Sequence, residues 1–256
     1  RRHQKVIEEA PSSFLTEETR ANMGAQSIGL AKAVDYSSAG TVEFIVDKDQ
    51  NFYFLEMNTR LQVEHPVTEL ITGIDLVEQM IRSAYGEELN ISQEDVKING
   101  WAMEARVYAE DPLRGFLPST GRVTDYIPPK EDDHIRIDSG IYEGSEISIY
   151  YDPMISKVIS YGHDRDQAIS KLRLALDEYY IRGVGHNISF LSDVLKSDRF
   201  RSGDITTKYI EEEYPDGFSG GTLSLEAWNI MIAVATTVHS CEVGRQSTID
   251  GKMNED

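Results

Sequence analysis

One stretch of eleven residues, Glu56 to Pro66, holds most of the side chains in this chain that could do chemistry together. It reads Glu-Met-Asn-Thr-Arg-Leu-Gln-Val-Glu-His-Pro, so two carboxylates, a carboxamide, a guanidinium and an imidazole are close in sequence. A turn does not need this concentration of ionisable and metal-coordinating groups to remain soluble. The stretch therefore predicts a reaction site.

The beginning of this stretch suits a hard cation. Residues 40–46 and 51–58 are β-branched and aromatic runs around a polar segment, which predicts a β-hairpin. Because side chains alternate along a strand, Glu56 and Asn58 share a face, and Glu43 joins them if the register places it opposite. Oxygen donors without Cys or a His pair favour Mg²⁺ or Mn²⁺ over Zn²⁺. The alternative is a set of solvent-facing strand residues paired with lysines.

The same two-residue spacing continues through Arg60, Gln62 and Glu64. We expect Pro66 to keep this segment extended rather than helical, so that the three side chains line one wall. A guanidinium beside a carboxylate can hold an anion while the carboxylate removes its proton. The alternative is an Arg–Glu surface pair, which stabilises a protein by about 0 to 1 kcal/mol.

The composition excludes several classes of function. The chain has 256 residues, 40% of them apolar, and a net charge of −19 from 25 Lys and Arg against 44 Asp and Glu. This acidity argues against sequence-independent binding to nucleic acid or to an anionic membrane. No apolar run is long enough to span a bilayer. The single Cys241 cannot form an internal disulfide, which fits a reducing compartment.

The first block, residues 1–90, combines helices with the hairpin. Residues 16–34 and 72–84 have helical patterns; Thr16 is a candidate N-cap, and Gly86 is a stop signal after the second helix. The chain opens without Met on a basic cluster and reaches strand-like sequence almost at once. We therefore expect it to be a fragment of a longer protein.

The second block, residues 91–215, is predicted to be an α+β unit with a mixed or antiparallel sheet and flanking helices. Short strand candidates come first, separated by Gly, Pro and Asp: 101–108, 121–127, 134–137, 147–150 and 155–161. Helices follow over 165–180 and from an N-cap at Asn187.

Residues 216–256 are predicted to be a linker and the start of a joining region. A linker comes first, and residues 224–238 then have a helical pattern with Leu225 and Trp228 on its apolar stripe. We expect the polar end from Gly244 to be frayed.

Two further segments carry candidate residues. His3 lies in the basic start Arg-Arg-His-Gln-Lys, where contact with phosphate or bicarbonate competes with a plain basic end. Glu104, Arg106 and Tyr108 share a face of a predicted strand, which alone indicates only an amphipathic strand.

Taken together, these segments resemble the biotin carboxylase family of ATP-grasp enzymes. The resemblance covers about residues 1–215 and rests on three motifs in the right order: Arg1 to Pro11, Glu56 to Glu69, and Ala109-Glu110-Asp111-Pro112. It implies the C-terminal half of an ATP-grasp fold and carboxylation of biotin with ATP and bicarbonate. Later segments, including 147–157 and 180–184, are most similar to propionyl-CoA carboxylase α subunits, with methylcrotonyl-CoA carboxylase α subunits as the near alternative.

The resemblance also implies roles for individual positions. The metal ligands that bridge the ATP phosphates match Glu43, Glu56 and Asn58. The nucleotide contacts match His3, Glu43, Ile45, Glu56 and Ile205. The bicarbonate pocket matches Lys5, Arg60, Gln62, Val63 and Glu64, with Glu64 as the base. The residue that stabilises the biotin enolate matches Arg106.

The mechanism implied by the resemblance begins with attack of bicarbonate on the γ-phosphate of ATP. The resulting carboxyphosphate breaks down to CO₂ and phosphate, and that phosphate takes the N1 proton of biotin before carboxylation. Metal ions and Arg60 neutralise the charge during transfer.

Two parts of the family's pattern have no match in this sequence. The N-terminal nucleotide-fold domain and the glycine-rich lid have no counterpart, so we expect the isolated chain to fold without turning over ATP or binding it tightly. No Ala-Met-Lys-Met attachment sequence occurs, so biotin is expected on a carrier domain outside this chain. The expected partners are that carrier domain and a carboxyltransferase β subunit, in a hetero-oligomer. The expected compartment is the mitochondrial matrix for a eukaryotic source and the cytoplasm for a bacterial one.

Two other functions stay open from the sequence. An ATP-grasp ligase of the carbamoyl phosphate synthetase type would share the metal ligands but has no biotin pocket, and Arg106 followed by Ala-Glu-Asp-Pro argues against it. An acidic fragment could also act only as a non-enzymatic interaction module.

Overall fold

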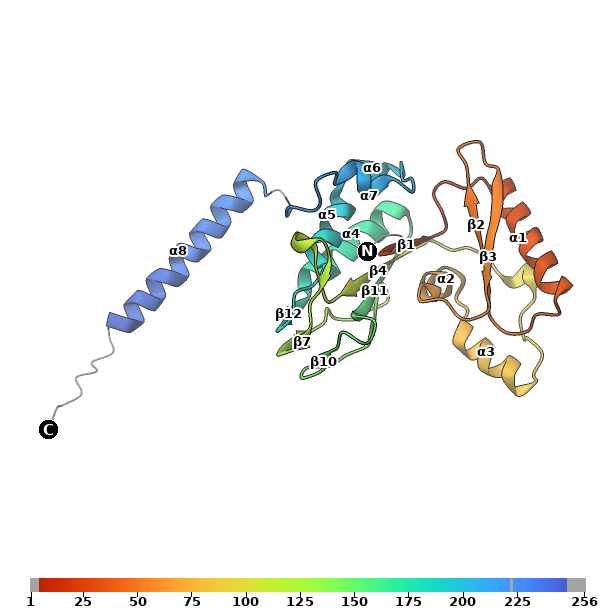
Figure 1. Cartoon of the computed structure of the whole chain (residues 1–256), viewed down its shortest axis with the longest axis horizontal. Helices are drawn as coiled ribbons and strands as arrows, with labels where there is room; N and C mark the ends of the chain where they lie inside the picture. The colour runs from red at the N-terminus through yellow and green to blue at the C-terminus, as the bar shows by residue number, and fades with distance from the viewer. Residues whose placement is uncertain (1–4, 222, 248–256) are drawn as a thin grey trace. The chain divides into compact units, whose positions relative to one another are not determined.

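The computed structural model describes residues 5–221 and 223–247, and the chain divides into two units, residues 1–219 and 220–256 (Figure 1). The larger unit holds every strand among the described residues, and all of its strand pairs are antiparallel. Helices flank these sheets. The predicted α+β class is confirmed.

A four-stranded antiparallel sheet is the centre of the larger unit. Its order is β1 (Ile7–Ala10), β4 (Trp101–Tyr108), β11 (Met154–Gly162) and β9 (Ile135–Ser139). The predicted strands 101–108, 134–137 and 155–161 lie in this sheet. β1 is the one of these four strands that is far from the others in sequence, and it pairs along β4.

One face of the sheet forms the main core. Met103, Ala105 and Val107 are fully buried there against α4 (Arg165–Glu178) and α5 (Ile188–Lys196). Figure 1 shows both helices beside β4 and β11. The predicted helical stripe of α4, with Ile169, Leu172 and Leu176, supplies the facing side chains.

The opposite face has an apolar end and a charged end. At the apolar end Ala102 and Ile159 pack against Val67 and Ile71 of α2 (His65–Thr72). The charged end carries Glu8, Glu104, Arg106 and Lys157 on three neighbouring strands. Alternation along each strand places these residues on the face that α2 covers.

Our expectation that Pro66 keeps residues 60–64 extended and prevents a helix was wrong, because Val63 and Glu64 form a turn and a helix begins at His65. Pro66 lies in the first turn of α2, where a missing N–H costs nothing because that group has no intrahelical partner. The predicted helix 72–84 also begins too early. α2 ends before Gly73, which takes a left-handed conformation, and α3 (Leu76–Tyr85) starts after a separate N-cap, Asp75.

The predicted hairpin is present as β2 (Thr41–Val46) and β3 (Phe52–Asn58). Asp47 Oδ1 accepts hydrogen bonds at 2.9 Å from the backbone N–H groups of Asp49 and Asn51, which shapes the polar turn. The predicted helix before it is α1 (Glu17–Ala33), and Thr16 caps it by accepting from the Thr19 N–H.

Short elements complete the larger unit. They are η1 (Gln93–Asp95), β5 (Glu110–Asp111), η2 (Pro112–Arg114), β6 (Leu117–Pro118), β7 (Gly121–Arg122), β8 (Asp125–Ile127), β10 (Glu146–Ile147), β12 (Tyr180–Arg182), α6 (Asp198–Ser202) and α7 (Tyr209–Glu213). The predicted strand 147–150 was wrong beyond Ile147, because residues 148–153 form a loop that exposes Tyr150 and Tyr151.

The second unit contains α8 (Leu225–Ser247), which has no buried side chain. It includes the predicted helix 224–238 but continues further, so the fraying expected from Gly244 was wrong as far as Ser247, and residues 248–256 lie outside the described residues. Among the described helices, none combines the length and apolar character needed to cross a membrane.

The packing of α4 gives a matched pair of stability variants. Leu172 is fully buried and Leu174, on the same helix, is largely exposed. Leu172→Ala should lower the free energy of unfolding by about 2 to 5 kcal/mol, because it leaves a cavity in the core. Leu174→Ala should change it by less than about 0.5 kcal/mol. Urea unfolding of this chain followed by circular dichroism measures both, and equal effects would contradict the predicted packing.

Candidate functional site

Three oxygen-bearing side chains meet on one face of the hairpin. Glu43 and Glu56 are directly opposite each other in the β2–β3 register, and Asn58 follows two residues later on β3. Asn58 Nδ2 donates to Glu43 Oε1 at 2.9 Å and to Glu56 Oε1 at 3.1 Å. The structure thus brings together the three predicted metal ligands.

This donor set fits a hard divalent cation. Two carboxylates and one amide leave coordination positions for phosphate oxygens, as Mg²⁺ and Mn²⁺ sites in nucleotide enzymes do. Rotation of the Asn58 amide by half a turn would direct its oxygen toward the carboxylates. Among the residues that the structure describes, no group of three or more His, Cys, Asp or Glu side chains is arranged to hold a metal ion.

Glu43 also connects the hairpin to the start of β1 and to the loop after β3. Its Oε1 accepts from Lys5 Nζ at 3.1 Å and from Gln62 Nε2 at 2.6 Å. Partial burial alone would raise the pKa of Glu43, but these two hydrogen bonds and the charges of Lys5 and Arg60 outweigh it and lower the pKa. Glu43 therefore remains a carboxylate, as a cation ligand must.

Lys5 stays protonated because neighbouring carboxylates outweigh the effect of its burial on its pKa. Burial lowers the pKa of Lys5, but the hydrogen bond and charge of Glu43, and the charges of Glu64 and Glu8, raise it overall. Its Nζ lies 3.6 Å from Glu64 Oε1. An ammonium group in this place can bind a small anion between the hairpin and the sheet.

Glu64 is bound by a residue of the four-stranded sheet. Arg106 Nη2 donates to Glu64 Oε2 at 2.7 Å and to Glu8 Oε1 at 3.3 Å. Burial lowers the pKa of Arg106, but Glu8 and Glu64 raise it overall, so the guanidinium stays charged. Arg106 thus connects a loop carboxylate to the charged end of the sheet face.

Arg60 lies in the same segment but makes weaker contacts. Its Nη1 donates to the Leu61 carbonyl at 3.2 Å, and its Nη2 is 3.4 Å from Asn58 Oδ1. The guanidinium therefore has donors left for an anion.

These residues line one polar hollow of about 450 Å³. Its lining contains predicted residues from three separate segments: Lys5, Glu43, Glu56, Asn58, Arg60, Gln62, Val63, Glu64 and Arg106. Two of the predicted residues are elsewhere, since Ile45 and Ile205 are exposed and do not line the hollow. His3 lies outside the described residues.

Three further residues lie at or near this hollow: Tyr108 and Asp152 line it, and Glu8 binds Arg106. Alternation along the predicted strand places Tyr108 on the same face as Arg106, although the sequence assigns it no role. Sequence reasoning missed Glu8 and Asp152. Nothing local indicated Asp152, because it comes from the loop before β11.

Asn187 lies at the N-cap position of α5, as predicted, but its side chain makes no capping hydrogen bond. Instead its Oδ1 accepts from the Tyr108 N–H at 2.8 Å and its Nδ2 donates to the Arg106 carbonyl at 3.1 Å. The buried side chain therefore fixes the end of β4.

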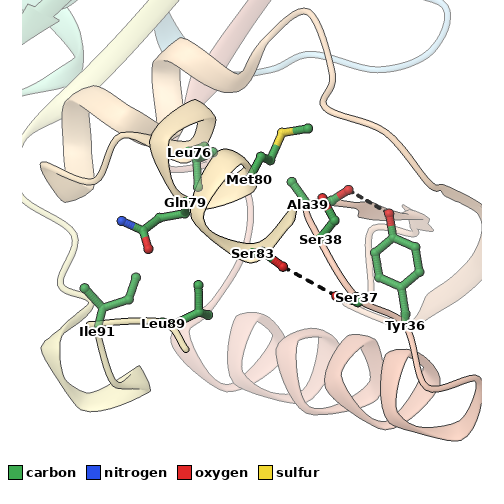
Figure 2. Close-up of a pocket in the computed structure, with 10 residues that line it drawn as sticks. All are labelled: Tyr36, Ser37, Ser38, Ala39, Leu76, Gln79, Met80, Ser83, Leu89 and Ile91. Atoms are coloured by element: carbon green, nitrogen blue, oxygen red, sulfur yellow. Dashed lines mark hydrogen bonds between the residues drawn. The ribbon is translucent and has the colours of Figure 1, made fainter. Parts of the chain in front are cut away.

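A second hollow of about 430 Å³ lies between α3 and the segment after α1 (Figure 2). Its lining is mainly apolar, with Leu76, Met80, Leu89 and Ile91, and the Tyr36 hydroxyl already donates to the Ala39 carbonyl. It contains none of the predicted site residues. The predicted site residues that the structure brings together are therefore those of the polar hollow.

Comparison with known proteins agrees with this geometry. A model of the carbamoyl-phosphate synthase L chain, ATP binding domain, matches residues 1–92, and one of the biotin carboxylase C-terminal domain matches residues 104–212. The propionyl-CoA carboxylase α chain of Caenorhabditis elegans, described as mitochondrial, is 60% identical over 96% of this chain. The chain belongs to the biotin carboxylase family.

Other relatives share less sequence identity with this chain. The propionyl-CoA carboxylase α chain of the bacterium Ruegeria pomeroyi is 55% identical over 99% of the chain. The mitochondrial methylcrotonoyl-CoA carboxylase subunit α of Rattus norvegicus is 48% identical over 84%. The chain spans only 34%, 40% and 30% of the C. elegans, bacterial and rat proteins, respectively.

A solved structure supports the fold at the level of the whole larger unit. The biotin carboxylase domain of Hydrogenobacter thermophilus 2-oxoglutarate carboxylase, a dimer in complex with MgADP, ADP and bicarbonate, has a TM-score of 0.81 and 47% identity. The match covers 83% of this chain and 47% of that one. The predicted C-terminal half of an ATP-grasp biotin carboxylase is confirmed.

Glu104 gives a prediction for the dependence of stability on pH. Its side chain is fully buried, and burial raises its pKa to about 8, although Lys157 and Arg106 oppose the shift. A carboxyl that keeps its proton in the folded state stabilises the fold below its unfolded pKa of about 4.5, and this contribution is lost as pH rises to about 8. The stability of Glu104→Gln relative to the unsubstituted chain should therefore increase between these two pH values.

Urea unfolding of both chains across pH 4 to about 9 measures this difference. Glu178→Gln is the control, because this side chain is exposed at the end of α4 and remains hydrated in both states. A difference for Glu104→Gln that does not change with pH would mean that Glu104 is ionised in the folded protein.

Proposed function

We propose that this chain is part of the biotin carboxylase component of a propionyl-CoA carboxylase, which uses ATP and bicarbonate to carboxylate biotin. The observation that carries the proposal is the contact of 2.7 Å between Arg106 and Glu64 beside Lys5, at the edge of the polar hollow. This contact supports a site in which Glu64 would act as the base, the Lys5 ammonium would bind the anion and Arg106 would supply a guanidinium. The identity to propionyl-CoA carboxylase α chains supports the choice of enzyme.

Bicarbonate would bind between Lys5, Arg60 and the loop residues Gln62, Val63 and Glu64. The two cations would attract the anion, and Gln62 would hold Glu43 in place while Glu64 accepts the bicarbonate proton. Glu64 suits this role because Arg106 orients one of its oxygens and leaves the other near Lys5, 3.6 Å away. Proton removal makes bicarbonate a better nucleophile toward the γ-phosphate.

ATP would lie over the hairpin face. A Mg²⁺ or Mn²⁺ ion held by Glu43, Glu56 and Asn58 would supply Lewis-acid stabilisation of phosphate charge. Arg60 would stabilise the charge on the transferred phosphoryl group. The assignments of His3, Ile45 and Ile205 to the nucleotide remain predictions.

Arg106 would have a second role toward biotin. Arg106 lines the hollow, and its guanidinium would stabilise the negative charge that develops on the ureido oxygen. Pairing with Glu8 and Glu64 keeps the group charged and in a fixed direction. Biotin would arrive on a carrier domain of the full-length protein.

The organisation of the full enzyme is part of the same proposal. We infer domain boundaries near residues 90 and 215, with residues 216–256 joining the carboxylase to the carrier domain and to a carboxyltransferase β subunit. The matches at 1–92 and 104–212 support the first boundary. The compartment would be the mitochondrial matrix in a eukaryote and the cytoplasm in a bacterium. The name of the C. elegans relative describes that protein as mitochondrial.

Three alternatives remain, and they make different demands on the site. A ligase of the carbamoyl phosphate synthetase type shares the ATP-binding family model, but it would need no group for biotin. A methylcrotonyl-CoA carboxylase would use the same site, and lower identity argues against it. An interaction-only role leaves the convergence of Lys5, Glu43 and Glu64 without a function.

Arg106→Ala in the full-length gene product separates biotin carboxylation from the ligase and interaction-only alternatives. Biotin-dependent, bicarbonate-dependent phosphate release should fall by about 100-fold or more in kcat, because a charge-stabilising group is lost. Arg82→Ala, at an exposed ion pair of α3, is the control and should keep full activity. Phosphate release that does not depend on biotin would favour the ligase alternative, and a pull-down in which a partner binds equally well after Glu56→Ala and Arg60→Ala would favour the interaction module.

The hairpin carboxylates give a metal-dependence prediction. Glu43→Gln and Glu56→Gln should each raise the Mg²⁺ concentration needed for half-maximal ATP cleavage by about 10-fold or more, since each removes a charged ligand. Asp49→Asn is the matched control, because it removes an exposed carboxylate from the turn of the same hairpin. An unchanged Mg²⁺ requirement in both hairpin variants would rule out these ligands.

A further inference from the structure

We propose that Lys157 is a positioning residue for bicarbonate: it fixes the Val63 carbonyl, and through it the loop that lines the anion pocket. This inference rests on the proposed function and deepens it. Lys157 does not line the hollow, and neither the sequence patterns nor the resemblance gave it a role.

The ammonium group of Lys157 is buried between the sheet and the loop. Lys157 is opposite Arg106 in the β4–β11 register, and its side chain is only 10% exposed. Its Nζ donates to the Val63 carbonyl at 3.0 Å and lies 2.8 Å from Asp138 Oδ2. A buried cation with one carboxylate and one carbonyl partner strongly restricts where that carbonyl can lie.

A chain of ion pairs holds Lys157 in turn. Asp138 faces Lys157 across β9 and β11, and Arg136 binds both Asp138 oxygens, at 2.8 and 3.2 Å. Arg136 Nη1 then donates to Glu69 Oε2 of α2 at 2.7 Å. Glu69 Oε1 accepts from the Leu76 N–H at 2.8 Å, which connects the chain to the start of α3.

The same helix holds the preceding carbonyl of the loop. His65 Nδ1 is 2.8 Å from the Gln62 carbonyl, and His65 Nε2 is 3.9 Å from Glu69 Oε2. Two successive carbonyls, at Gln62 and Val63, are therefore bound by groups that do not line the hollow. Their own side chains and that of Glu64 remain in its lining.

The direction of these carbonyls matters because the pocket must accept an anion. A carbonyl oxygen carries partial negative charge and would repel bicarbonate if the loop turned it inward. Holding it outward also keeps Gln62 at 2.6 Å from Glu43 and Glu64 at 2.7 Å from Arg106. Loss of the ammonium should therefore weaken bicarbonate binding more than nucleotide binding, whose proposed ligands are on the hairpin.

The test uses Lys157→Met in the full-length holoenzyme, which keeps the apolar stem and removes the charge. The KM for bicarbonate should rise by about 10-fold or more, because a shift of the loop by about 1 Å is costly for a positioned substrate. The KM for ATP should change by less than about 2-fold. Lys157→Arg, which restores a cation, should recover part of the bicarbonate affinity.

Arg165→Met is the matched structural control. Arg165 is also a largely buried cation with one carboxylate and one carbonyl partner, Glu9 at 2.6 Å and the Arg201 carbonyl at 2.7 Å, but neither partner lines the hollow. It should lower the Tm as Lys157→Met does and leave the KM for bicarbonate unchanged.

Three results would overturn the inference: an unchanged KM for bicarbonate in Lys157→Met, an equal rise for ATP, or the same rise in Arg165→Met. If Lys157→Met does not fold, Asp138→Asn tests the same chain of ion pairs while keeping the ammonium, and an unchanged KM for bicarbonate there also overturns the inference.

Glu64→Gln distinguishes the positioning role of Lys157 from the proposed function. If Glu64→Gln abolishes turnover and Lys157→Met has no effect, only the positioning role fails; if the unsubstituted holoenzyme shows no bicarbonate-dependent turnover, the proposed function itself fails.

Discussion

Buried charges on one face of the four-stranded sheet must be paired, and the site depends on how this is achieved. Glu8, Arg106 and Lys157 lie on adjacent strands, and burying any of these charges without a partner would cost several kcal/mol, which is comparable with the net stability of a whole domain. Glu104, on the same face, avoids this cost by keeping its proton. The loop before α2 supplies part of the solution, with Glu64 for Arg106 and a carbonyl for Lys157. The requirement for pairing thus brings the loop to the sheet and creates the anion pocket beside it.

The pairing also explains why the charged groups differ in protonation. Glu104 has no exposure and no hydrogen-bond partner for its oxygens among the described residues, so burial keeps its proton to about pH 8. Burial and the neighbouring Glu64 raise the pKa of Glu8 to about 7. Glu43, at the more open hairpin, has a lowered pKa because Lys5 and Gln62 bind it. Carboxyls of one type therefore suit different tasks: a neutral packing group in the sheet and a charged ligand on the hairpin.

The apolar end of the same sheet face stabilises the position of the loop before α2. Val67 and Ile71 of α2 pack on Ala102 and Ile159, so the helix that follows the loop is anchored by hydrophobic contact. Because α2 begins directly after Glu64, its anchoring limits the loop to a few positions over the charged end. On the other face, α4 and α5 bury the core that keeps β4 and β11 in register. β4 and β11 thus carry both the charged groups beside the site and the apolar side chains of the main core.

The sequence by itself determined the helices with clear caps, the hairpin, the α+β class and the clustering of chemical groups in Glu56 to Pro66, because local periodicity and residue type encode these features. It could not predict α2, since Pro66 is compatible with either a helix start or an extended chain. Only the tertiary structure decided that Glu8, Asp152 and Lys157 belong with the site and that Asn187 stabilises β4. These residues are brought together by strand pairing across roughly a hundred positions of sequence, and no local pattern records which strands will be neighbours.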